Sequence, residues 1–190
     1  MSDTNPTTPP SDRRGFFTKA GAIVCGSLLA LIPLASGIAV FLSPAWRKQV
    51  GSWVRVALLD QVPDDGHPVS FPVITDRVDA WNRYPAQRIG AVYLVRDAGT
   101  EKPTAFSATC PHAGCFIGYT PGQDHFQCPC HTSAFKFDGT RVNGDKEVAP
   151  RGMDSLDVEV RPSPADNSVR EVWVHFERFQ TGKKEKIPAA

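Results

Sequence analysis

The sequence has no excess of charge of either sign. Its 21 lysines and arginines nearly balance 20 aspartates and glutamates, so the formal net charge of the 190-residue chain is +1. The chain also lacks any basic stretch with interleaved aromatic residues, which is the pattern that indicates binding to nucleic acid. We therefore expect no nucleic-acid partner.

Charged residues are missing altogether from Ala20 to Trp46, a run of 27 positions. As a helix this run would extend about 40 Å, which exceeds the hydrocarbon core of a bilayer at about 30 Å. The apolar part of a cleaved secretory signal has only about 7–15 residues. The length of the run therefore predicts a retained transmembrane anchor over 20–46.

The chain before this anchor is first polar and then basic. Residues 1–12 are proline-rich and too poor in apolar side chains to fold alone. The pair Arg13–Arg14 then precedes two phenylalanines and the apolar run, so residues 1–19 resemble a disordered N-terminus with a twin-arginine export signal. An ordinary positive flank of a membrane helix is the alternative interpretation.

Both interpretations give the same orientation. The positive-inside rule places the arginine-bearing end of the anchor on the cytoplasmic side of the membrane. We therefore expect a single-pass protein of a bacterial cytoplasmic membrane, with the N-terminus in the cytoplasm and the remaining chain on the periplasmic or outer side. A disulfide can persist on that side.

No helical period of apolar residues follows the anchor. After a linker at 47–51, the chain has short runs rich in valine and other strand-forming residues, bounded by proline, glycine or aspartate. These runs predict strands at 54–59, 71–75, 91–95, 156–161 and 169–176. The seventeen prolines also suit a loop-rich, strand-rich body. The sequence predicts an all-β domain over 52–178, followed by a frayed, lysine-rich tail at 179–190.

Four of the five cysteines and two of the five histidines, His112 and His131, belong to two short segments within 22 positions; His125 lies between these segments. They form two boxes: the letters C-P-H-A-G-C at Cys110–Cys115 and C-P-C-H-T-S-A-F at Cys128–Phe135. Thiolate and imidazole together are the ligand set of a soft-metal site. The C-x-H and C-x-x-H pairs of the two boxes predict a metal centre with four protein ligands, namely Cys110, His112, Cys128 and His131.

The order of these ligands distinguishes two kinds of metal site. A structural zinc site with two cysteines and two histidines usually takes its ligands as C-x-x-C and H-x-x-x-H pairs. Here each box supplies one sulfur and one nitrogen, so two loops can hold two metal atoms, with both sulfurs on one and both imidazoles on the other. That ligation is typical of a Rieske 2Fe-2S centre. A non-redox, zinc-stabilised interaction domain on a membrane anchor is the alternative.

The remaining cysteines of the boxes, Cys115 and Cys130, occupy matching places beside the ligand pairs. One interpretation is two further buried thiols. The other is a disulfide that joins the two loops, and an even number of cysteines outside the membrane segment favours it in an oxidising compartment.

The two boxes make this sequence similar to the Rieske iron-sulfur proteins of cytochrome bc-type quinol-oxidising complexes. The resemblance implies a 2Fe-2S cluster with two cysteines on an inner iron and two histidines on an outer iron, and a disulfide between Cys115 and Cys130. It also implies an antiparallel, two-lobed domain in which a cluster lobe at about 107–150 is inserted in a base lobe. Residues 148–152 resemble the proline loop that covers the cluster in this family.

Four residues of the second box influence the redox potential and the quinol contact of such a cluster. Ser133 matches the family's serine, whose hydroxyl donates to a cluster sulfide. Phe135 stands where high-potential members carry a tyrosine that donates to a ligand sulfur, and Thr132 replaces the usual glycine. These two departures favour a lower potential and a quinol such as menaquinone. By the same resemblance, His131 is the ligand expected to face the quinol and accept its electron and proton.

The resemblance implies an electron-transfer subunit and not a complete enzyme. Such a subunit takes an electron from quinol beside a b-type cytochrome and passes it to a c-type cytochrome, so the quinol:cytochrome reductase activity belongs to the assembled complex. The Rieske small subunit of a molybdenum-dependent arsenite oxidase is an alternative, because it also has an export signal and these boxes, often with phenylalanine at the position of Phe135. The sequence does not identify the partner.

Overall fold

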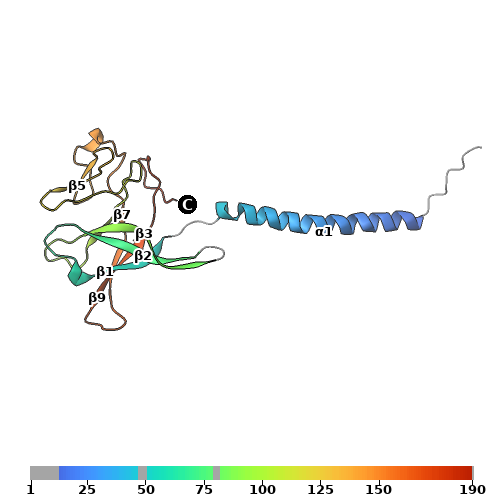
Figure 1. The fold of residues 1–190 in the computed structure, drawn as a ribbon, viewed down its shortest axis with the longest axis horizontal. Helices are drawn as coiled ribbons and strands as arrows, with labels where there is room; N and C mark the ends of the chain where they lie inside the picture. Colours follow the sequence, from blue (N-terminus) through green and yellow to red (C-terminus); the bar gives the residue numbers. More distant parts are fainter. Residues whose placement is uncertain (1–12, 47–50, 79–81, 190) are drawn as a thin grey trace, which may run out of the picture. The chain divides into compact units, whose positions relative to one another are not determined.

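The structure, a computed structural model, describes residues 13–46, 51–78 and 82–189. The first twelve residues of the predicted disordered N-terminus, and most of the predicted linker, lie outside the described residues. The chain divides into two units, with the boundary between residues 48 and 49. One unit contains the N-terminal helix and the other contains the strands (Figure 1).

The first unit is one helix, α1 (Arg13–Trp46). It contains an apolar segment of 29 residues, Gly15–Ser43, in which the mean hydropathy reaches 2.3 over 18 residues, none of them buried. Three hydroxyl groups, those of Thr18, Ser36 and Ser43, each donate to the carbonyl three residues earlier. These bonds satisfy the hydroxyls locally, which suits them to an apolar surrounding. As predicted, this helix is long and apolar enough to span a membrane.

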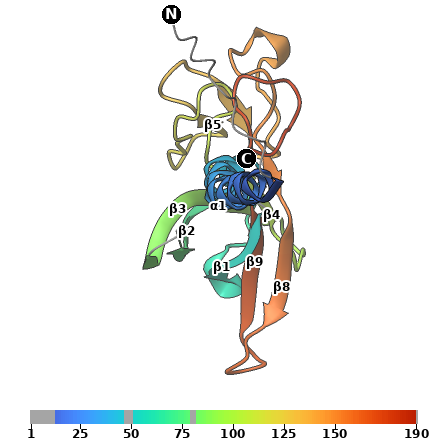
Figure 2. The same cartoon turned by 90° about the vertical axis from the view of Figure 1, so that its right-hand side faces the viewer.

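The second unit consists of antiparallel strands in three sheets. The first sheet has the order β1-β9-β8, formed by Ser52–Leu58, Arg170–Phe176 and Val158–Pro162. The second has the order β2-β3-β4-β7, formed by Val69–Val78, Arg83–Val95, Thr104–Ser107 and Ser155–Leu156. The third is the hairpin of β5 (His125–Gln127) and β6 (Ala134–Lys136). Figure 2 shows the strands of the first sheet side by side. The all-β prediction is confirmed.

Strand β3 separates two hydrophobic cores. Its residues 91–95 are all buried, although successive side chains of a strand point to opposite faces of the sheet. Val92 and Leu94 enter the first core, whereas the three residues that alternate with them enter the second. Strand β4 divides in the same way, with Ala105 in the first core and Phe106 in the second. The second sheet is therefore a wall shared by both cores.

The two cores have different compositions. The first joins the two larger sheets and consists mostly of valine and alanine. The second is richer in aromatic residues and includes two of the predicted metal ligands; its buried members are Ala91, Tyr93, Val95, Phe106, Ala108, Cys110, Ile117, Phe126, Cys128, Phe135, Ala149 and Met153. The two cysteines among the predicted metal ligands thus belong to a core separate from the one between the larger sheets.

All five predicted strands are present, with the run at 156–161 divided between β7 and β8. The sequence analysis missed β4, β5 and β6, each of which has only three or four residues. A strand this short contains too few alternations for its period to be recognised. Two short 3-10 turns, Leu59–Gln61 and Gly144–Lys146, are the only helical segments after α1 in the part of the chain that the structure describes.

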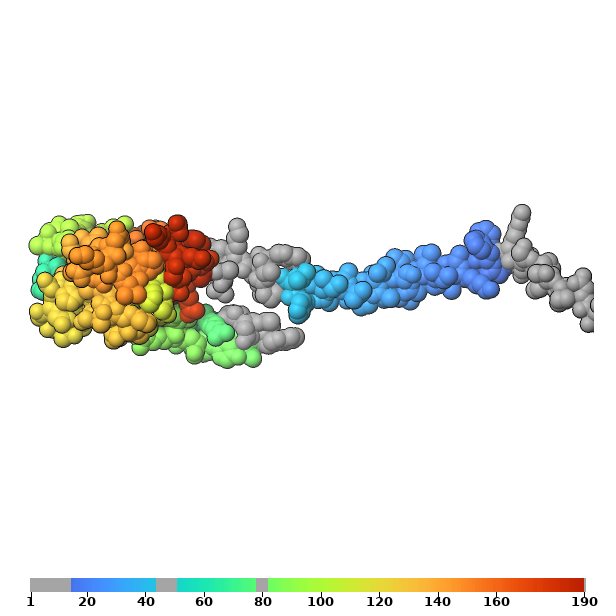
Figure 3. Space-filling view, turned by 90° about the horizontal axis from the view of Figure 1, so that it is seen from above, coloured from blue at the N-terminus to red at the C-terminus, as the bar shows by residue number. Residues whose placement is uncertain are grey.

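The prediction of a frayed tail at 179–190 is wrong for the described part of that segment. The amide of Gln180 donates to the carbonyl of Ile187 at 2.8 Å, so the tail turns back on itself. The guanidinium of Arg151 donates to the carbonyls of Gln180 and Lys183, and Figure 3 shows the C-terminal residues (red) against this part of the chain (orange). Lysine content indicated exposure, but it could not indicate main-chain partners so far away in the sequence.

Candidate metal centre

The two boxes form two loops beside the second core. The first loop runs between Thr109 and Phe116, which form an isolated antiparallel bridge. The second joins β5 to β6, and there the amide of Cys128 donates to the carbonyl of Ser133 at 2.8 Å. Both loops are therefore closed at their bases by backbone hydrogen bonds, which restrict where their cysteines and histidines can point.

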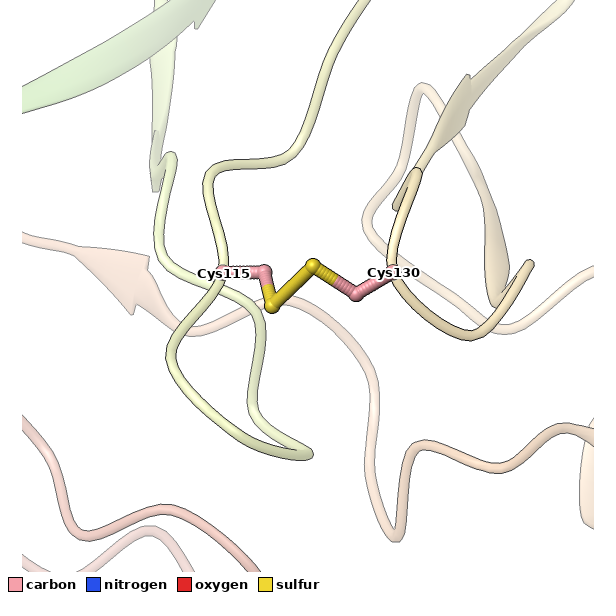
Figure 4. The surroundings of a disulfide bond; sticks show 2 residues. All are labelled: Cys115 and Cys130. Carbon is pink, nitrogen blue, oxygen red and sulfur yellow. A yellow bond between two sulfur atoms is a disulfide. The ribbon is translucent and has the colours of Figure 1, made fainter.

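A disulfide joins Cys115 of the first loop to Cys130 of the second (Figure 4). Their Cα atoms are 6.6 Å apart, and 15 positions separate them in the sequence. The alternative of two free thiols is therefore wrong. The Sγ atom of Cys128 lies within 4.8 Å of both sulfurs of the bridge. The disulfide thus fixes the two loops to each other directly beside a predicted ligand.

The four predicted ligands divide into a buried pair and an outer pair. Cys110 and Cys128 are free thiols, each only 1% exposed. His112 is half-buried and His131 is exposed, and their rings meet edge to face with centroids 4.6 Å apart. The sulfur ligands therefore lie toward the core and the imidazoles toward the surface.

The electrostatics of the thiol pair suit a metal. Burial raises the pKa of the Cys110 thiol to about 11; a backbone hydrogen bond from His112 opposes this rise, and the neighbouring Cys128 thiol adds to it. Two thiolates this close together in a buried place need a positive charge between them, and bound iron supplies it. Two inner sulfurs and two outer neutral nitrogens are a donor set that fits a mixed-ligand 2Fe-2S cluster.

A third loop is hydrogen-bonded to the second. The amide of Ala149, which is fully buried, donates to Oγ of Ser133 at 3.1 Å. A carboxylate oxygen of Glu147 accepts a hydrogen bond from the amide of Ala134 at 3.2 Å. Residues 148–152, which the sequence analysis assigned to a covering loop, are therefore bonded to the second box through Ala149, and the residue just before them is bonded to it through Glu147.

Residues 52–158, which contain both boxes, match the Rieske [2Fe-2S] domain. This chain belongs to the Rieske [2Fe-2S] family. The cofactor is therefore a 2Fe-2S cluster, and the alternative of a zinc-stabilised interaction domain is wrong. The mixed sulfur and nitrogen donor set of the Rieske loops agrees with that cofactor.

Several curated proteins are similar to this Rieske chain over most of their length. The chain is 32% identical over 167 residues to the cytochrome b6-f complex iron-sulfur subunit 2 of Trichormus variabilis, covering 85% of this chain and 87% of the relative. It is 27% identical over 159 residues to the cytochrome b6-f complex iron-sulfur subunit of Synechococcus sp. (strain JA-3-3Ab), covering 80% and 84%. It is also 28% identical over 111 residues to the menaquinol:cytochrome c reductase iron-sulfur subunit of Bacillus subtilis, covering 57% and 62%.

Among solved structures, the cyanobacterial plasma membrane Rieske protein PetC3 from Synechocystis PCC 6803 is similar with a TM-score of 0.40 and 19% identity. The match covers 64% of this chain and 97% of that chain.

Two further residues of the second Rieske box have unusual surroundings. Phe135 is fully buried in the second core and pairs with Phe126 across the hairpin. Thr132 has φ of 60°, a left-handed conformation that a β-branched residue rarely adopts. Its hydroxyl donates to the carbonyl of His131 at 2.7 Å. The residue next to His131 is therefore held in a strained backbone conformation, for which glycine is better suited.

Sequence reasoning missed two contacts that organise the Rieske loops. The hydroxyl of Tyr93 donates to the carbonyl of Ile117 at 3.0 Å, and burial raises the pKa of this phenol, which keeps it a donor. The guanidinium of Arg151 forms two hydrogen bonds of 2.8 Å with the carboxylate of Asp154. Neither contact could be recognised in the sequence. Tyr93 and Ile117 are far apart along the chain, and an arginine close to an aspartate is too common a pattern to indicate a buried ion pair.

Proposed function

We propose that the four predicted ligands hold the cluster, with Cys110 and Cys128 on the inner iron and His112 and His131 on the outer iron. The observation that supports this assignment is the division of the four side chains into a buried thiol pair and a surface imidazole pair. When bound, such a cluster supplies one-electron transfer.

We further propose that the chain is the electron-transfer subunit of a membrane quinol:cytochrome oxidoreductase. The observation that carries this proposal is the similarity to iron-sulfur subunits of cytochrome b6-f complexes, which extends over 85% of the chain and so beyond the Rieske domain. The proposed partners are a b-type cytochrome, beside which the quinol binds, and a c-type cytochrome, which receives the electron. The names of the relatives support this choice, since they include cytochrome b6-f and cytochrome c.

His131 is proposed as the residue that contacts the quinol. Its ring is exposed, whereas His112 is half-buried, so a substrate in a partner subunit can reach His131 first. A coordinated imidazole keeps a second ring nitrogen, which can accept the proton of a quinol hydroxyl. The low exposure of both thiols keeps water away from the sulfur side, so proton uptake is confined to the imidazoles.

Menaquinol is the proposed quinol. Phe135 brings no hydroxyl to the fully buried position it occupies, so this residue offers no hydrogen bond to a ligand sulfur. A missing donor of this kind lowers the potential of an iron-sulfur centre. A relative of this chain is the menaquinol:cytochrome c reductase iron-sulfur subunit of Bacillus subtilis, whose name supports the same choice.

We propose that the N-terminus is cytoplasmic and that the Rieske domain lies on the outer side of a bacterial cytoplasmic membrane. The disulfide between Cys115 and Cys130 supports this orientation, because such bonds persist in oxidising compartments. The anchor is expected to be retained. N-terminal sequencing of the protein from salt-washed membranes checks this: a mature terminus near Gly37–Ser43, on soluble protein, would show that the signal is cleaved.

Isolation of the complex from native membranes tests the proposed function. A b-type cytochrome should co-purify with this chain, and the preparation should reduce a c-type cytochrome with menaquinol. The variant His131→Ala should abolish this activity, whereas His67→Ala, which changes an exposed histidine outside both boxes, should leave it unchanged. Co-purification with a molybdopterin subunit, together with arsenite-dependent electron transfer, would instead establish the arsenite oxidase alternative.

A further inference from the structure

The C-terminal residues 178–189, which we call the strap, are hydrogen-bonded to the first ligand loop. The amide of Gly182 donates to the carbonyl of Pro111 at 2.8 Å. Pro111 is fully buried and stands between Cys110 and His112 in the sequence. Gly182 has φ of 71°, a conformation that favours glycine and brings its amide toward this loop. The strap therefore contacts the backbone between two proposed ligands.

Arg151 attaches the strap to the covering loop. Its side chain is only 10% exposed, and Nε and Nη2 bond the carboxylate of Asp154. The same guanidinium also donates from Nη1 to the carbonyl of Lys183 at 2.6 Å and from Nη2 to the carbonyl of Gln180 at 3.0 Å. A buried arginine that satisfies one carboxylate and two strap carbonyls has a fixed position. The strap is therefore held by a rigid group two residues after Ala149.

Lys186 provides a third attachment. Its Nζ donates to the carbonyl of Ser155 in β7 at 2.6 Å and lies 4.6 Å from the ring centroid of Phe179. The three attachments lie on the first ligand loop, the covering loop and the second sheet. The strap thus connects the loop of Cys110 and His112 to parts of the molecule that lie outside both boxes.

A cavity of about 310 Å³ lies between the strap and the first ligand loop. Its lining includes Cys110, Ser107 and Thr109, together with Arg178 and Thr181 of the strap. The cavity therefore lies beside Cys110, and the strap forms part of its wall.

We propose that the strap is a positioning element of the metal centre, and that Arg151 is the positioning residue that fastens it. The strap holds the first ligand loop through Gly182 and limits the entry of water to the Cys110 side. This inference rests on the ligand assignment proposed above. Release of the strap lets the first loop move and lets water enter the cavity. Water stabilises the more negative, reduced centre, so the midpoint potential rises.

Two variants of the full-length protein release the strap in different ways. The double variant Arg151→Met with Asp154→Leu removes the donor and its carboxylate together, so that no lone charge stays buried. A chain that ends at Gln180 removes residues 181–190, including Gly182 and Lys183, and keeps the pair of Arg151 and Asp154. The control is Lys184→Ala, which changes an exposed strap side chain.

Both variants should lose iron to a chelator about tenfold faster than the wild type. The double variant loses both hydrogen bonds from Arg151 to the strap, and the truncated chain loses the bond from Gly182 to the first ligand loop. Their midpoint potentials should rise, while the control should match the wild type in both. If the double variant does not fold, the rate of iron loss and the midpoint potential of the truncated chain test the proposal. Wild-type rates of iron loss and an unchanged midpoint in the folded variants would overturn the proposal.

Hydrogen exchange separates this proposal from the ligand assignment. The amides of residues 109–116 are measured in the iron-loaded, full-length proteins, where their protection reports the restraint of the loop whichever residues bind the cluster. Faster exchange of this loop in both released variants is expected. Unchanged exchange would show that the strap does not restrain the loop, whatever the ligands are.

Discussion

The amide of Ala149 donates a 3.1 Å hydrogen bond to Oγ of Ser133, and both residues are fully buried. This bond uses the hydroxyl oxygen as an acceptor, so the hydroxyl proton can still be donated to a second group. The covering loop thus orients a donor that lies in the box of Cys128 and His131. We therefore propose two functions for Ser133: it anchors the loop, and it tunes the potential of the cluster.

Ser133→Ala should lower the midpoint potential of the cluster. The lost hydroxyl no longer compensates negative charge on the reduced centre, and a hydrogen bond to a charged group contributes about 1.5–3 kcal/mol. A tenfold change in the one-electron equilibrium corresponds to about 59 mV, so we expect a fall of tens of millivolts up to about 100 mV. A redox titration followed by EPR measures it. Ser70→Ala, at an exposed position of β2, is the control. Equal midpoints in both variants would exclude Ser133 as a donor.

Phe135→Tyr should raise the midpoint by a similar amount, because the new hydroxyl can donate to a ligand sulfur. Phe135 is fully buried, so a hydroxyl that found no partner would cost about 1–3 kcal/mol of stability. The same redox titration detects a raised midpoint, and a thermal unfolding experiment detects a loss of stability from an unpaired hydroxyl. Phe137→Tyr adds the same group to a half-buried neighbour and should leave the midpoint unchanged. A destabilised Phe135→Tyr protein with the wild-type midpoint would mean that position 135 does not face a ligand sulfur.

Thr132→Gly should stabilise the second loop. A left-handed conformation costs an ordinary residue about 1–2 kcal/mol, whereas glycine costs about 0.5–1 kcal/mol more backbone entropy. The difference predicts a gain of up to about 1 kcal/mol in the free energy of unfolding, measured with a chemical denaturant. Thr120→Gly is the matched control, since this exposed threonine does not have a positive φ, and it should lose stability. An equal decrease in the free energy of unfolding of the two variants would show that the backbone at Thr132 is not strained.

Removal of the disulfide should destabilise the domain and speed the loss of iron. For a closed loop of this length the expected contribution to the free energy of unfolding is about 3 kcal/mol. The double variant Cys115→Ala with Cys130→Ala should therefore unfold at a lower temperature, while Cys25→Ala, in α1, should not. Wild-type stability of the double variant, or a mass spectrum that shows two free thiols in the exported protein, would contradict a structural function of the bridge.

The parts of this molecule that could be predicted are those encoded by nearby residues. The spacing of Cys110, His112, Cys128 and His131 is local, and so is the unbroken apolar run of α1. The five predicted strands also have local patterns. The structure places α1 and the five strands where the sequence analysis expected them, although an apolar run such as 91–95 does not reveal that its two faces belong to different cores.

The parts that could not be predicted depend on contacts between distant residues. The tail has the composition of a frayed end, yet Arg151 and Pro111 supply partners for its backbone groups. Strands β5 and β6 are too short to have a recognisable period, and their pairing becomes favourable only when Phe126 and Phe135 enter the second core. Tertiary burial, and not local propensity, decides these elements.

The ligand assignment is the central claim, and pulsed EPR of the reduced, full-length protein with ¹⁵N-labelled histidine tests it most directly. The chain has five histidines, and the account predicts that two of them, His112 and His131, give nitrogen couplings typical of direct coordination to iron. The substitutions His112→Ala and His131→Ala should each abolish the cluster signal. A reduced cluster without two such nitrogen couplings, or a His131→Ala protein that keeps its full iron content and both couplings, would contradict the account.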